Sequence, residues 1–419
     1  MLAHVSSILN QCINMNASSG KRPIPKRADA LIDAAAATKA LGVSRSTLYA
    51  YVSRGLVRAT QHPSVAKASL YVAADVQALI ARKTRMRRPR AAAATALDFG
   101  LPVLKTKLTH FEDDRLYYRS EEAIGFSRRA TLEEAAQLLW QTDGADPFAG
   151  VVFDPAKIAG WNEIASRYAP VRATERASML LPLLTAQEAP SAGRAGAHAF
   201  GSAARLVLAI AAAVVPVTSP VVSPLHRAIA QAWRKPKASE AIRRALVLLA
   251  DHELNASTFA VRVVASTGAR HTHCVLAGIA ALSGPLHGAA TERTRLFLNG
   301  IAGAREAAEA VATRLQHGEL LPGFGHFLYP DGDPRAAELL SQVKLDPVAE
   351  ATLRAGREMG GVEPNVDFAL VALERSLELP AGAALALFAV GRSVGWLAHV
   401  FEQRSSGTLI RPRAEFVQE

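Results

Sequence analysis

The sequence has little of what builds disulfide scaffolds or membrane spans. Cys12 and Cys274 are its two cysteines among 419 residues, which excludes a disulfide-rich scaffold and a cysteine-rich zinc module. Its longest uninterrupted apolar run, Leu206–Val215, is ten residues long, whereas a membrane-spanning helix needs about 20. The start of the chain also lacks the order of a secretory signal, because the basic residues at 21–27 follow the weakly apolar stretch. We therefore expect a cytoplasmic protein with no membrane contact.

Several common catalytic signatures are missing as well. The chain has neither a glycine-rich phosphate loop ending in Gly-Lys-Ser/Thr nor the glycine fingerprint of dinucleotide-binding domains. His252 and Glu253 do not begin a metalloprotease motif, because Ala256 stands where the second histidine would be. His271 and His273 have too few neighbouring ligands for a metal ion, so we interpret them as packing or surface residues.

The charge of the chain is concentrated at one end. Residues 1–95 carry 15 Lys and Arg against 3 Asp and Glu, a net charge of +12, whereas residues 96–419 carry 33 against 34. The neutrality of the longer part argues against a protein that coats nucleic acid along its whole surface. We divide the basic end into a flexible tail (1–30), a small domain (31–83) and a basic, alanine-rich linker (84–95).

The small basic domain has the outline of a winged helix-turn-helix. Helical propensity predicts a helix over 34–41, and Ser44 is a good N-cap for a second helix over 45–54. Short strands at 56–57 and 69–72 and a helix from Asp75 to about 82 complete the pattern. The second helix resembles the recognition helix of excisionase and MerR-type domains. Its exposed face would present four groups to DNA phosphates and base edges: Arg45, Ser46, Thr47 and Arg54.

Helical periodicity dominates the remainder of the chain, and segments with strand alternation are scarce. Apolar residues recur at helical spacing over 132–140, 203–215, 241–249, 305–315, 336–343, 367–377 and 383–400. A stretch of about 325 residues can bury a large core and carry an inserted subdomain. We expect a mainly α fold over 96–419.

Three histidines lie beside small residues in this helical part. His287 lies within Gly-Pro-Leu-His-Gly, His326 ends Pro-Gly-Phe-Gly-His, and His252 precedes Glu-Leu-Asn-Ala-Ser. Glycine beside a histidine lets a ligand or the backbone approach the ring closely. Taken singly, each histidine is more often a loop residue with a satisfied imidazole, and Asp367 after its Pro-Asn pair is more often a helix cap.

Taken together and in this order, these segments closely resemble the citrate synthase family. The chain adds Asp-Pro-Arg at 333–335, Asn-Val-Asp-Phe at 365–368, Gly-Arg-Ser-Val-Gly-Trp-Leu-Ala-His at 391–399 and Arg-Pro-Arg at 411–413. The resemblance covers about 96–419. It implies a citrate synthase fold, with a large helical domain, a small inserted subdomain over about 289–379, and an obligate two-fold dimer with shared active sites.

The resemblance also implies a reaction. Acetyl-CoA condenses with oxaloacetate, and water hydrolyses the citryl thioester to give citrate and CoA. By resemblance Asp367 is the base that removes the methyl proton, His287 hydrogen-bonds the thioester oxygen, and His326 polarises the ketone of the acceptor. The residues implied for binding oxaloacetate are His252, Arg335, Arg392 and, donated by the other subunit, Arg411. No metal or prosthetic group is implied, because CoA enters as a substrate carrier.

Alternatives to this activity stay open. A 2-methylcitrate synthase would use propionyl-CoA, and one methylene changes selectivity by only about 1–3 kcal/mol. Phe327 and Pro330 stand where the family often has basic residues, so the contacts to CoA phosphates are undefined. The chain could instead be a metabolite-responsive regulator that brings its basic module to DNA. The retained Asp367 favours the enzyme, because binding alone needs no base. The basic module could also serve only dimer contacts or solubility.

Overall fold

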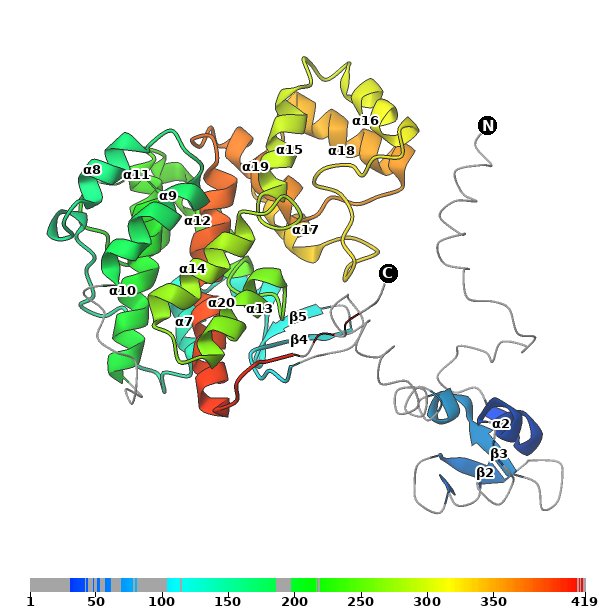
Figure 1. Cartoon of the computed structure of the whole chain (residues 1–419). Coiled ribbons are helices and arrows are strands. Elements are labelled where there is room, and N and C mark those ends of the chain that lie inside the picture. The colour runs from blue at the N-terminus through cyan, green and yellow to red at the C-terminus, as the bar shows by residue number, and fades with distance from the viewer. Residues whose placement is uncertain are drawn as a thin grey trace. The chain divides into compact units, whose positions relative to one another are not determined.

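Two separate units make up the chain, Met1–Val103 and Leu104–Glu419. The computed structural model (Figure 1) describes residues 31–41, 43, 48, 51–52, 57–61, 69–77, 80, 104–113, 115–185, 197–215, 217, 219–412, 414 and 416.

The first unit has a helix and a three-stranded antiparallel sheet. Helix α2 (Ala34–Leu41) follows strand β1 (Leu31–Asp33), and the sheet order is β1-β3-β2, with β2 at Ala59–Gln61 and β3 at Ser69–Val72. The Asp33 carboxylate accepts a hydrogen bond from the Ala36 N–H at 2.7 Å, which satisfies one free donor of the first turn of α2. A small core of its own lies between the helical and strand residues: Ala37, Leu41, Leu48, Val57, Tyr71 and Val76.

The predictions for this unit are confirmed in part. The helix over 34–41 and the strand over 69–72 occur as predicted, whereas the strand predicted at 56–57 is wrong, because Val57 is a core residue and pairing begins at Ala59. The last helix begins at Ala73 rather than Asp75, and Asp75 instead holds Arg58 in an ion pair at 2.9 Å. Strand β1 was not predicted. Residues 44–47 and 53–56, which include the four DNA-binding candidates, lie outside the described residues.

The second unit is mainly helical, as predicted. Its helices are α6 (Ala123–Ser127), α7 (Leu132–Trp140), α8 (Trp161–Arg167), α9 (Ala173–Leu180), α10 (Ala197–Val214), α11 (Leu225–Ala232), α12 (Ser239–Leu248), α13 (Ala256–Ser266), α14 (His271–Leu282), α15 (Ala290–Asn299), α16 (Ala307–Gln316), α17 (Pro334–Leu340), α18 (Pro347–Gly360), α19 (Val366–Ser376) and α20 (Ala383–Ser406). Short 3₁₀ turns lie at Pro155–Lys157, Leu181–Leu184 and Pro236–Ala238. All seven predicted helical segments are helices.

A small sheet that the sequence did not predict precedes these helices. Strands β4 (Thr109–Glu112), β5 (Arg115–Tyr118) and β6 (Glu121–Glu122) form an antiparallel meander in the order β4-β5-β6. Its Tyr118 is buried and donates to the carbonyls of Val247 and Leu248 at 2.9 and 3.1 Å. The meander therefore supports the C-terminal end of α12, where the functional site begins.

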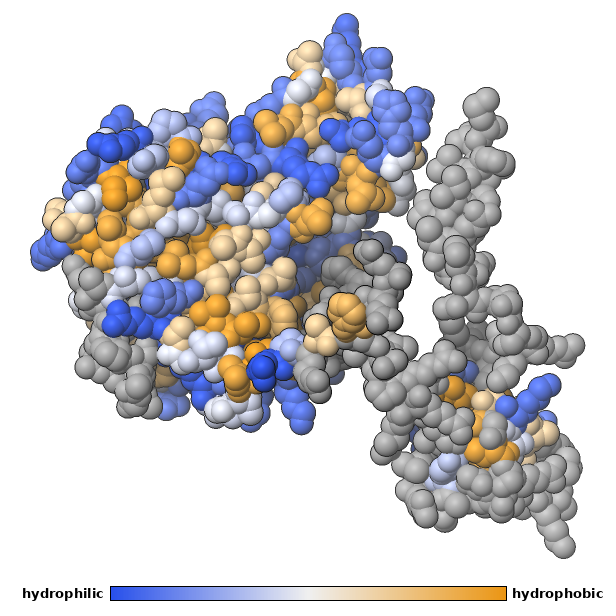
Figure 2. Space-filling model, viewed as in Figure 1, coloured by the Kyte–Doolittle hydropathy of each residue, from blue (hydrophilic) through white to orange (hydrophobic). Residues whose placement is uncertain are grey.

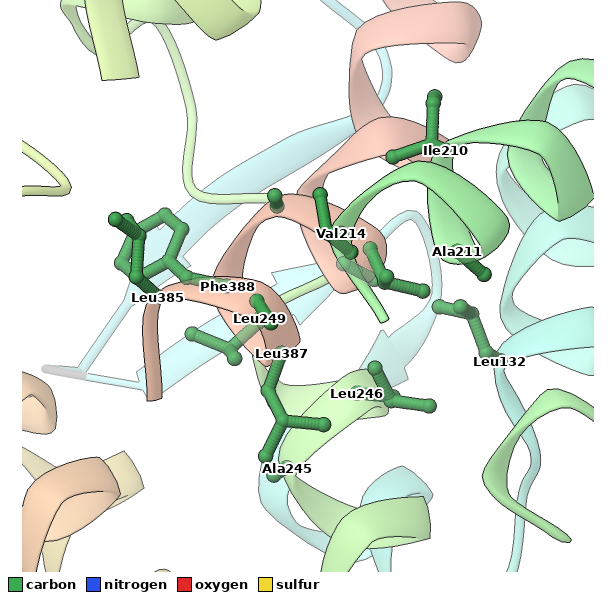
Figure 3. Close-up of a cluster of buried hydrophobic side chains, with 14 of the residues drawn as sticks. Leu132, Ile210, Ala211, Val214, Ala245, Leu246, Leu249, Leu385, Leu387 and Phe388 are labelled. Atoms are coloured by element: carbon green, nitrogen blue, oxygen red, sulfur yellow. The ribbon is translucent and has the colours of Figure 1, made fainter. Parts of the chain in front are cut away.

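Helix α20 is the centre of the unit. It contacts α7, α10, α12, α13 and α14, and Figure 3 shows side chains from α10, α12 and α20 meeting in one apolar cluster. Within the described residues α20 is the one helix long and apolar enough to span a membrane by length and composition, and 94% of its most apolar window is buried inside the protein. Such burial is what a core helix shows.

Helices α15 to α19 pack mainly on one another. Contacts join α16 with α18, α17 with α19 and α15 with α19, and Figure 1 shows the five helices grouped beside the larger body. Three of their N-termini are capped by the local sequence: Asp333 precedes Pro334 in α17, Asp346 precedes Pro347 in α18, and Asn365 precedes α19. We call residues 290–376, from the start of α15 to the end of α19 with the loops between them, the small subdomain, and the rest of Leu104–Glu419 the large domain.

Candidate active site

The site begins where α12 ends against α20. The Gly395 N–H donates to the Ala250 carbonyl at 3.0 Å. A Cβ at position 395 would run into that carbonyl oxygen and into the Asp251 side chain, so only glycine allows the two segments to approach this closely. This contact fixes the backbone just before His252.

A buried network lies beneath His252. The Asp251 carboxylate accepts from Thr109 Oγ1 at 2.8 Å and from His399 Nε2 at 3.3 Å, and all three residues are buried. Although burial opposes ionisation, His399 and Arg392 lower the pKa of Asp251. A fixed negative charge is therefore held below the site.

His252 meets two residues of the small subdomain. Its Nε2 lies 3.0 Å from Tyr329 Oη, and its ring lies edge-on to His326, with centroids 5.3 Å apart. Burial, reinforced by the positive charges of Arg335 and Arg392, lowers the pKa of His252 well below its usual value. Burial also raises the pKa of Tyr329 to about 12. At neutral pH this pair is an uncharged imidazole against an intact phenol.

His326 is held by a turn rich in glycine. Gly323 and Gly325 have φ angles of +84° and +73°, a region that side chains disfavour. The Leu328 N–H donates to His326 Nδ1 at 3.1 Å, so the neutral ring carries its proton on Nε2. Burial and the charge of Arg335 lower the pKa of His326 to about 4. The residue is therefore a neutral N–H donor at physiological pH.

Arg335 is clamped by an adjacent carboxylate. Its Nε and Nη2 donate to the two oxygens of Asp333 at 3.0 and 2.8 Å, and both side chains are almost completely buried. Asp333 Oδ2 also accepts from the Val366 N–H at 3.1 Å, at the start of α19. Because Asp333 takes the Nε and Nη2 edge, a ligand carboxylate would meet the Nη1 side of the guanidinium.

Arg392 lies on α20 and is 1% exposed. Its Nε donates to the Leu249 carbonyl at 2.8 Å, and its guanidinium lies over the Phe388 ring at 5.0 Å. Burial lowers the pKa of Arg392 to about 10, which leaves the side chain cationic at neutral pH. Arg392 thus gives the site a second buried guanidinium, and its charge, like that of Arg335, acts on His252.

Asp367 occupies the first turn of α19, but it does not cap the helix. The cap is Asn365, whose Oδ1 accepts from the Asp367 N–H at 3.0 Å, so the interpretation of Asp367 as a cap is wrong. Its Oδ1 atom is buried without a hydrogen-bond partner among the described residues. Burial, assisted by the Asp333 charge and opposed by Arg335, raises the pKa of Asp367 to about 7. A carboxyl group with this pKa exchanges protons readily near neutrality.

His287 is oriented by Ser257. His287 Nε2 lies 2.7 Å from Ser257 Oγ, and that oxygen also accepts from Trp396 Nε1 at 3.2 Å. The Ser257 hydroxyl lies 2.8 Å from Asn255 Oδ1 as well. Burial, and to a lesser degree Arg392, lowers the pKa of His287 to about 4, so this imidazole is also neutral.

Six of the seven predicted site residues thus share one neighbourhood. The charges of Arg335 and Arg392 act on the histidines, and the charge of Arg335 acts on Asp367. Arg411 is exposed on the segment after α20. Among the described residues no group of three or more His, Cys, Asp or Glu could hold a metal ion.

The sequence did not single out three supporting residues. They are Ser257, Tyr329 and Asp333. Asp333 lies within the Asp-Pro-Arg motif and Ser257 within the segment that follows His252, whereas Tyr329 lies three residues after His326 and outside the quoted motifs. Ser257 lies 30 positions from His287, and no local pattern connects the two.

Comparison with known proteins gives one family. A family model described as the C-terminal domain of citrate synthase matches residues 96–413. Citrate synthase 2 of Bacillus subtilis is 38% identical over 187 residues, which are 42% of this chain and 50% of that protein. The 2-methylcitrate synthase of Shewanella oneidensis is 35% identical over 182 residues, or 41% of this chain and 48% of that protein. The matched segments span about half the length of these relatives.

Solved structures agree on the fold. The crystal structure of citrate synthase from Pyrobaculum aerophilum aligns with a TM-score of 0.62 and 26% identity, covering 76% of this chain and 91% of that one. A ternary complex of the Thermoplasma acidophilum citrate synthase with carboxymethyl coenzyme A and oxaloacetate aligns with a TM-score of 0.59 at 22% identity, over 76% and 94% of the two chains. At that identity the likeness shows the fold alone.

Proposed function

The chain belongs to the citrate synthase family, and on that premise we propose that it condenses acetyl-CoA with oxaloacetate and water to give citrate and CoA. The observation that carries the proposal is the setting of Asp367. One oxygen of Asp367 is buried without a hydrogen-bond partner among the described residues, and the pKa of the group is raised to about 7. A carboxylate in this setting reduces the stability of the fold unless the oxygen meets a proton or a substrate C–H.

The chemistry needs this environment. The methyl group of an acetyl thioester is a very weak acid, so its proton leaves only when the enolate oxygen is stabilised at the same time. In the proposed reaction Asp367 takes the proton and a neutral His287 donates to the enolate oxygen. Donation from His287 Nδ1 requires the Ser257 hydroxyl to donate to Nε2, 2.7 Å away, in place of its hydrogen bond to Asn255 Oδ1.

The acceptor would lie between the histidines and the two guanidiniums. The enol carbon attacks the ketone carbon of oxaloacetate, while the Nε2–H of His326 donates to the ketone oxygen as it becomes negative. The carboxylates of oxaloacetate would meet Arg335 and Arg392, whose burial strengthens each charge-assisted hydrogen bond. In this proposal His252 also contacts oxaloacetate. Hydrolysis of the citryl thioester then releases citrate and CoA.

A thiol-release assay tests the proposal. Purified protein is mixed with acetyl-CoA and free thiol is followed with and without oxaloacetate. Thiol release that depends on oxaloacetate is expected, and its absence with every acyl-CoA tried would contradict the proposed function.

A 2-methylcitrate synthase is the second candidate, favoured by the relative of that name. Propionyl-CoA differs from acetyl-CoA by one methylene, which discriminates by about 10–200-fold at most. The same assay with both thioesters, read as kcat/KM, decides between them. Higher kcat/KM for propionyl-CoA would replace the first proposal.

We also propose that two copies share each site. Arg411 is exposed, and Leu409 and Phe416 on the same C-terminal segment are 59% and 87% exposed, as expected for apolar groups that a partner covers. Figure 2 shows further apolar area on the viewed face of the large domain. Mixing Arg411→Ala with Asp367→Ala protein should restore partial activity after subunit exchange. Mixed dimers without activity would contradict a shared site.

DNA binding by the first unit is a further proposal. Its support is a separate apolar core, a three-stranded sheet beside a helix, and the net charge of +12 over residues 1–95. Retention on genomic DNA fragments should fall steeply with salt, because bound phosphates release counterions. The comparison is full-length protein against a chain starting at Ala91. Equal retention by the two would leave the first unit as a partner-docking or structural domain.

A further inference from the structure

The buried carboxylate of Glu338 connects the small subdomain to the large domain through ion pairs. Glu338 lies on α17, three residues after Arg335, and its side chain is 5% exposed. It accepts from Arg128 Nη2 at 2.8 Å and Nε at 3.2 Å, and its other oxygen accepts from Arg244 Nη1 at 2.6 Å. Both arginines belong to the large domain.

The two arginines that bind Glu338 lie on helices α6 and α12, which contact each other. Arg128 is the C-cap of α6, and Arg244 lies on α12. Arg244 is itself held by Glu240, one turn earlier, at 2.9 Å. Helix α12 is anchored in turn by the buried Arg243, which donates to the carbonyls of Ser127 and Arg128 at 2.9 and 3.1 Å. The network therefore joins α6, α12 and α17.

The same α12 also positions the other guanidinium of the site. The Leu249 carbonyl at the end of α12 accepts from Arg392 Nε at 2.8 Å. Arg335 lies on α17, and α17 is connected to α12 by the hydrogen bond between Glu338 and Arg244. The spacing of the two guanidiniums is thus set through one helix, and that spacing decides whether two carboxylates of one small molecule can be bound at once.

We propose that Glu338 is a positioning residue for the acceptor: by fixing α17 to α12 it sets the distance between Arg335 and Arg392 that a C4 dicarboxylate requires. The proposal rests on the proposed function for the identity of the acceptor. Glu338 does not touch the substrate, so its loss weakens dicarboxylate binding and leaves the proton transfer at Asp367 intact.

The small subdomain offers a matched control. Arg357 and Glu363 form an ion pair at 2.8 Å through two donors to one carboxylate oxygen. Both residues belong to the small subdomain, so this pair does not cross to the large domain. Glu363→Gln removes an ion pair of similar length without releasing α17 from α12.

The experiment measures oxaloacetate binding by calorimetry and steady-state kinetics in wild type, Glu338→Gln, Glu338→Asp and Glu363→Gln. Glu338→Gln should raise both the Kd and the KM for oxaloacetate about tenfold, within the range of coupling in ion-pair networks. Its kcat at saturating acceptor and its KM for acyl-CoA should stay within about twofold of wild type. Glu338→Asp should recover part of the affinity, and Glu363→Gln should match wild type.

A ligand-free measurement separates positioning from general stability. Amide hydrogen exchange over 334–340 should quicken in Glu338→Gln and not in Glu363→Gln. Should Glu338→Gln fail to fold, Arg128→Gln removes half of the same network from an exposed guanidinium. Unchanged oxaloacetate affinity in the folded variant would overturn the proposal, as would a loss of kcat and affinity in equal measure.

The outcomes also separate this inference from the proposed function. Wild type that binds oxaloacetate but releases no thiol would refute the synthase activity, and the positioning role would still be decided by the calorimetry. Wild type that releases thiol while Glu338→Gln keeps its oxaloacetate KM would refute only the positioning role. Wild type that neither binds oxaloacetate nor releases thiol would refute both.

Discussion

The large domain and the small subdomain hold their shares of the site by different means. His252 and Arg392 are fixed by close apolar and backbone packing around α20, where Gly395 meets the Ala250 carbonyl. In the small subdomain Arg335 and the start of α19 are held by the Asp333 carboxylate. The Gly395 contact involves no charged group, whereas the buried pair of Asp333 and Arg335 exists only while both groups are charged. Removal of charge should therefore act most directly on the part of the site that the small subdomain holds.

The largest expected effect concerns the base. Asp367→Asn keeps the volume and removes the proton acceptor, so kcat should fall by about 10²–10⁴. Steady-state thiol release measures it, with Asp331→Asn on the exposed loop nearby as the control. Turnover like that of wild type would remove Asp367 from the mechanism.

The same variant carries a stability signature. The pKa of Asp367 is raised from its usual value to about 7 in the folded chain by burial, so wild type loses stability as the pH rises from about 4 to 7 while the carboxyl ionises. Asp367→Asn avoids that cost. Its Tm should exceed that of wild type at pH 8, and the difference should shrink toward pH 4.

The pH dependence of activity should show which residue of the site titrates near neutral pH. The base must be ionised, so kcat/KM should fall about tenfold per pH unit below the pKa of Asp367, which is about 7 in the ligand-free chain. His287 and His326, with pKa values of about 4, stay neutral over this range. A profile of kcat/KM between pH 5 and 9 that is flat, or that follows a group titrating near 4, would contradict the assignment.

A pair of substitutions contrasts packing with charge. Gly395→Ala places a methyl group against backbone and should destabilise the fold by about 1–3 kcal/mol, measured by denaturant unfolding. Asp333→Asn leaves Arg335 buried without its counter-charge, so the KM for oxaloacetate should rise by about 10–100-fold. The contrast between the two halves fails if Gly395→Ala leaves stability unchanged, or if Asp333→Asn keeps the wild-type KM.

The smallest effect is expected at Ser257. Ser257→Ala removes the hydrogen bond to His287 Nε2 and should lower kcat about tenfold through disorientation of the ring. Ser257→Thr keeps the hydroxyl and is the control. Equal kcat in Ser257→Ala and wild type would show that packing alone orients His287.

The helical architecture was predictable because its signals are local. The apolar periodicity of 132–140 predicts helix α7 to the residue, and in the structure Thr131 and Glu134 form a capping box at its start. The β4–β6 meander was not predicted, because its short strands take their stability from pairing and from the contact of Tyr118 with α12. Strand β2 was misplaced because the apolar signal at Val57 lies before the paired residues, which begin at Ala59.

The sequence by itself determined which chemical groups the protein has and in what order: an acid, three histidines and two guanidiniums spaced as in one enzyme family. Only the tertiary structure decided their chemical states. The pKa of Asp367 near 7, the neutral ring of His326 with its proton on Nε2, and the clamp of Asp333 on Arg335 arise from burial and neighbouring charges. The tie from Glu338 to Arg128 joins residues 210 positions apart. Electrostatic energies depend on distance in space and on exposure to water, and the folded chain alone sets both.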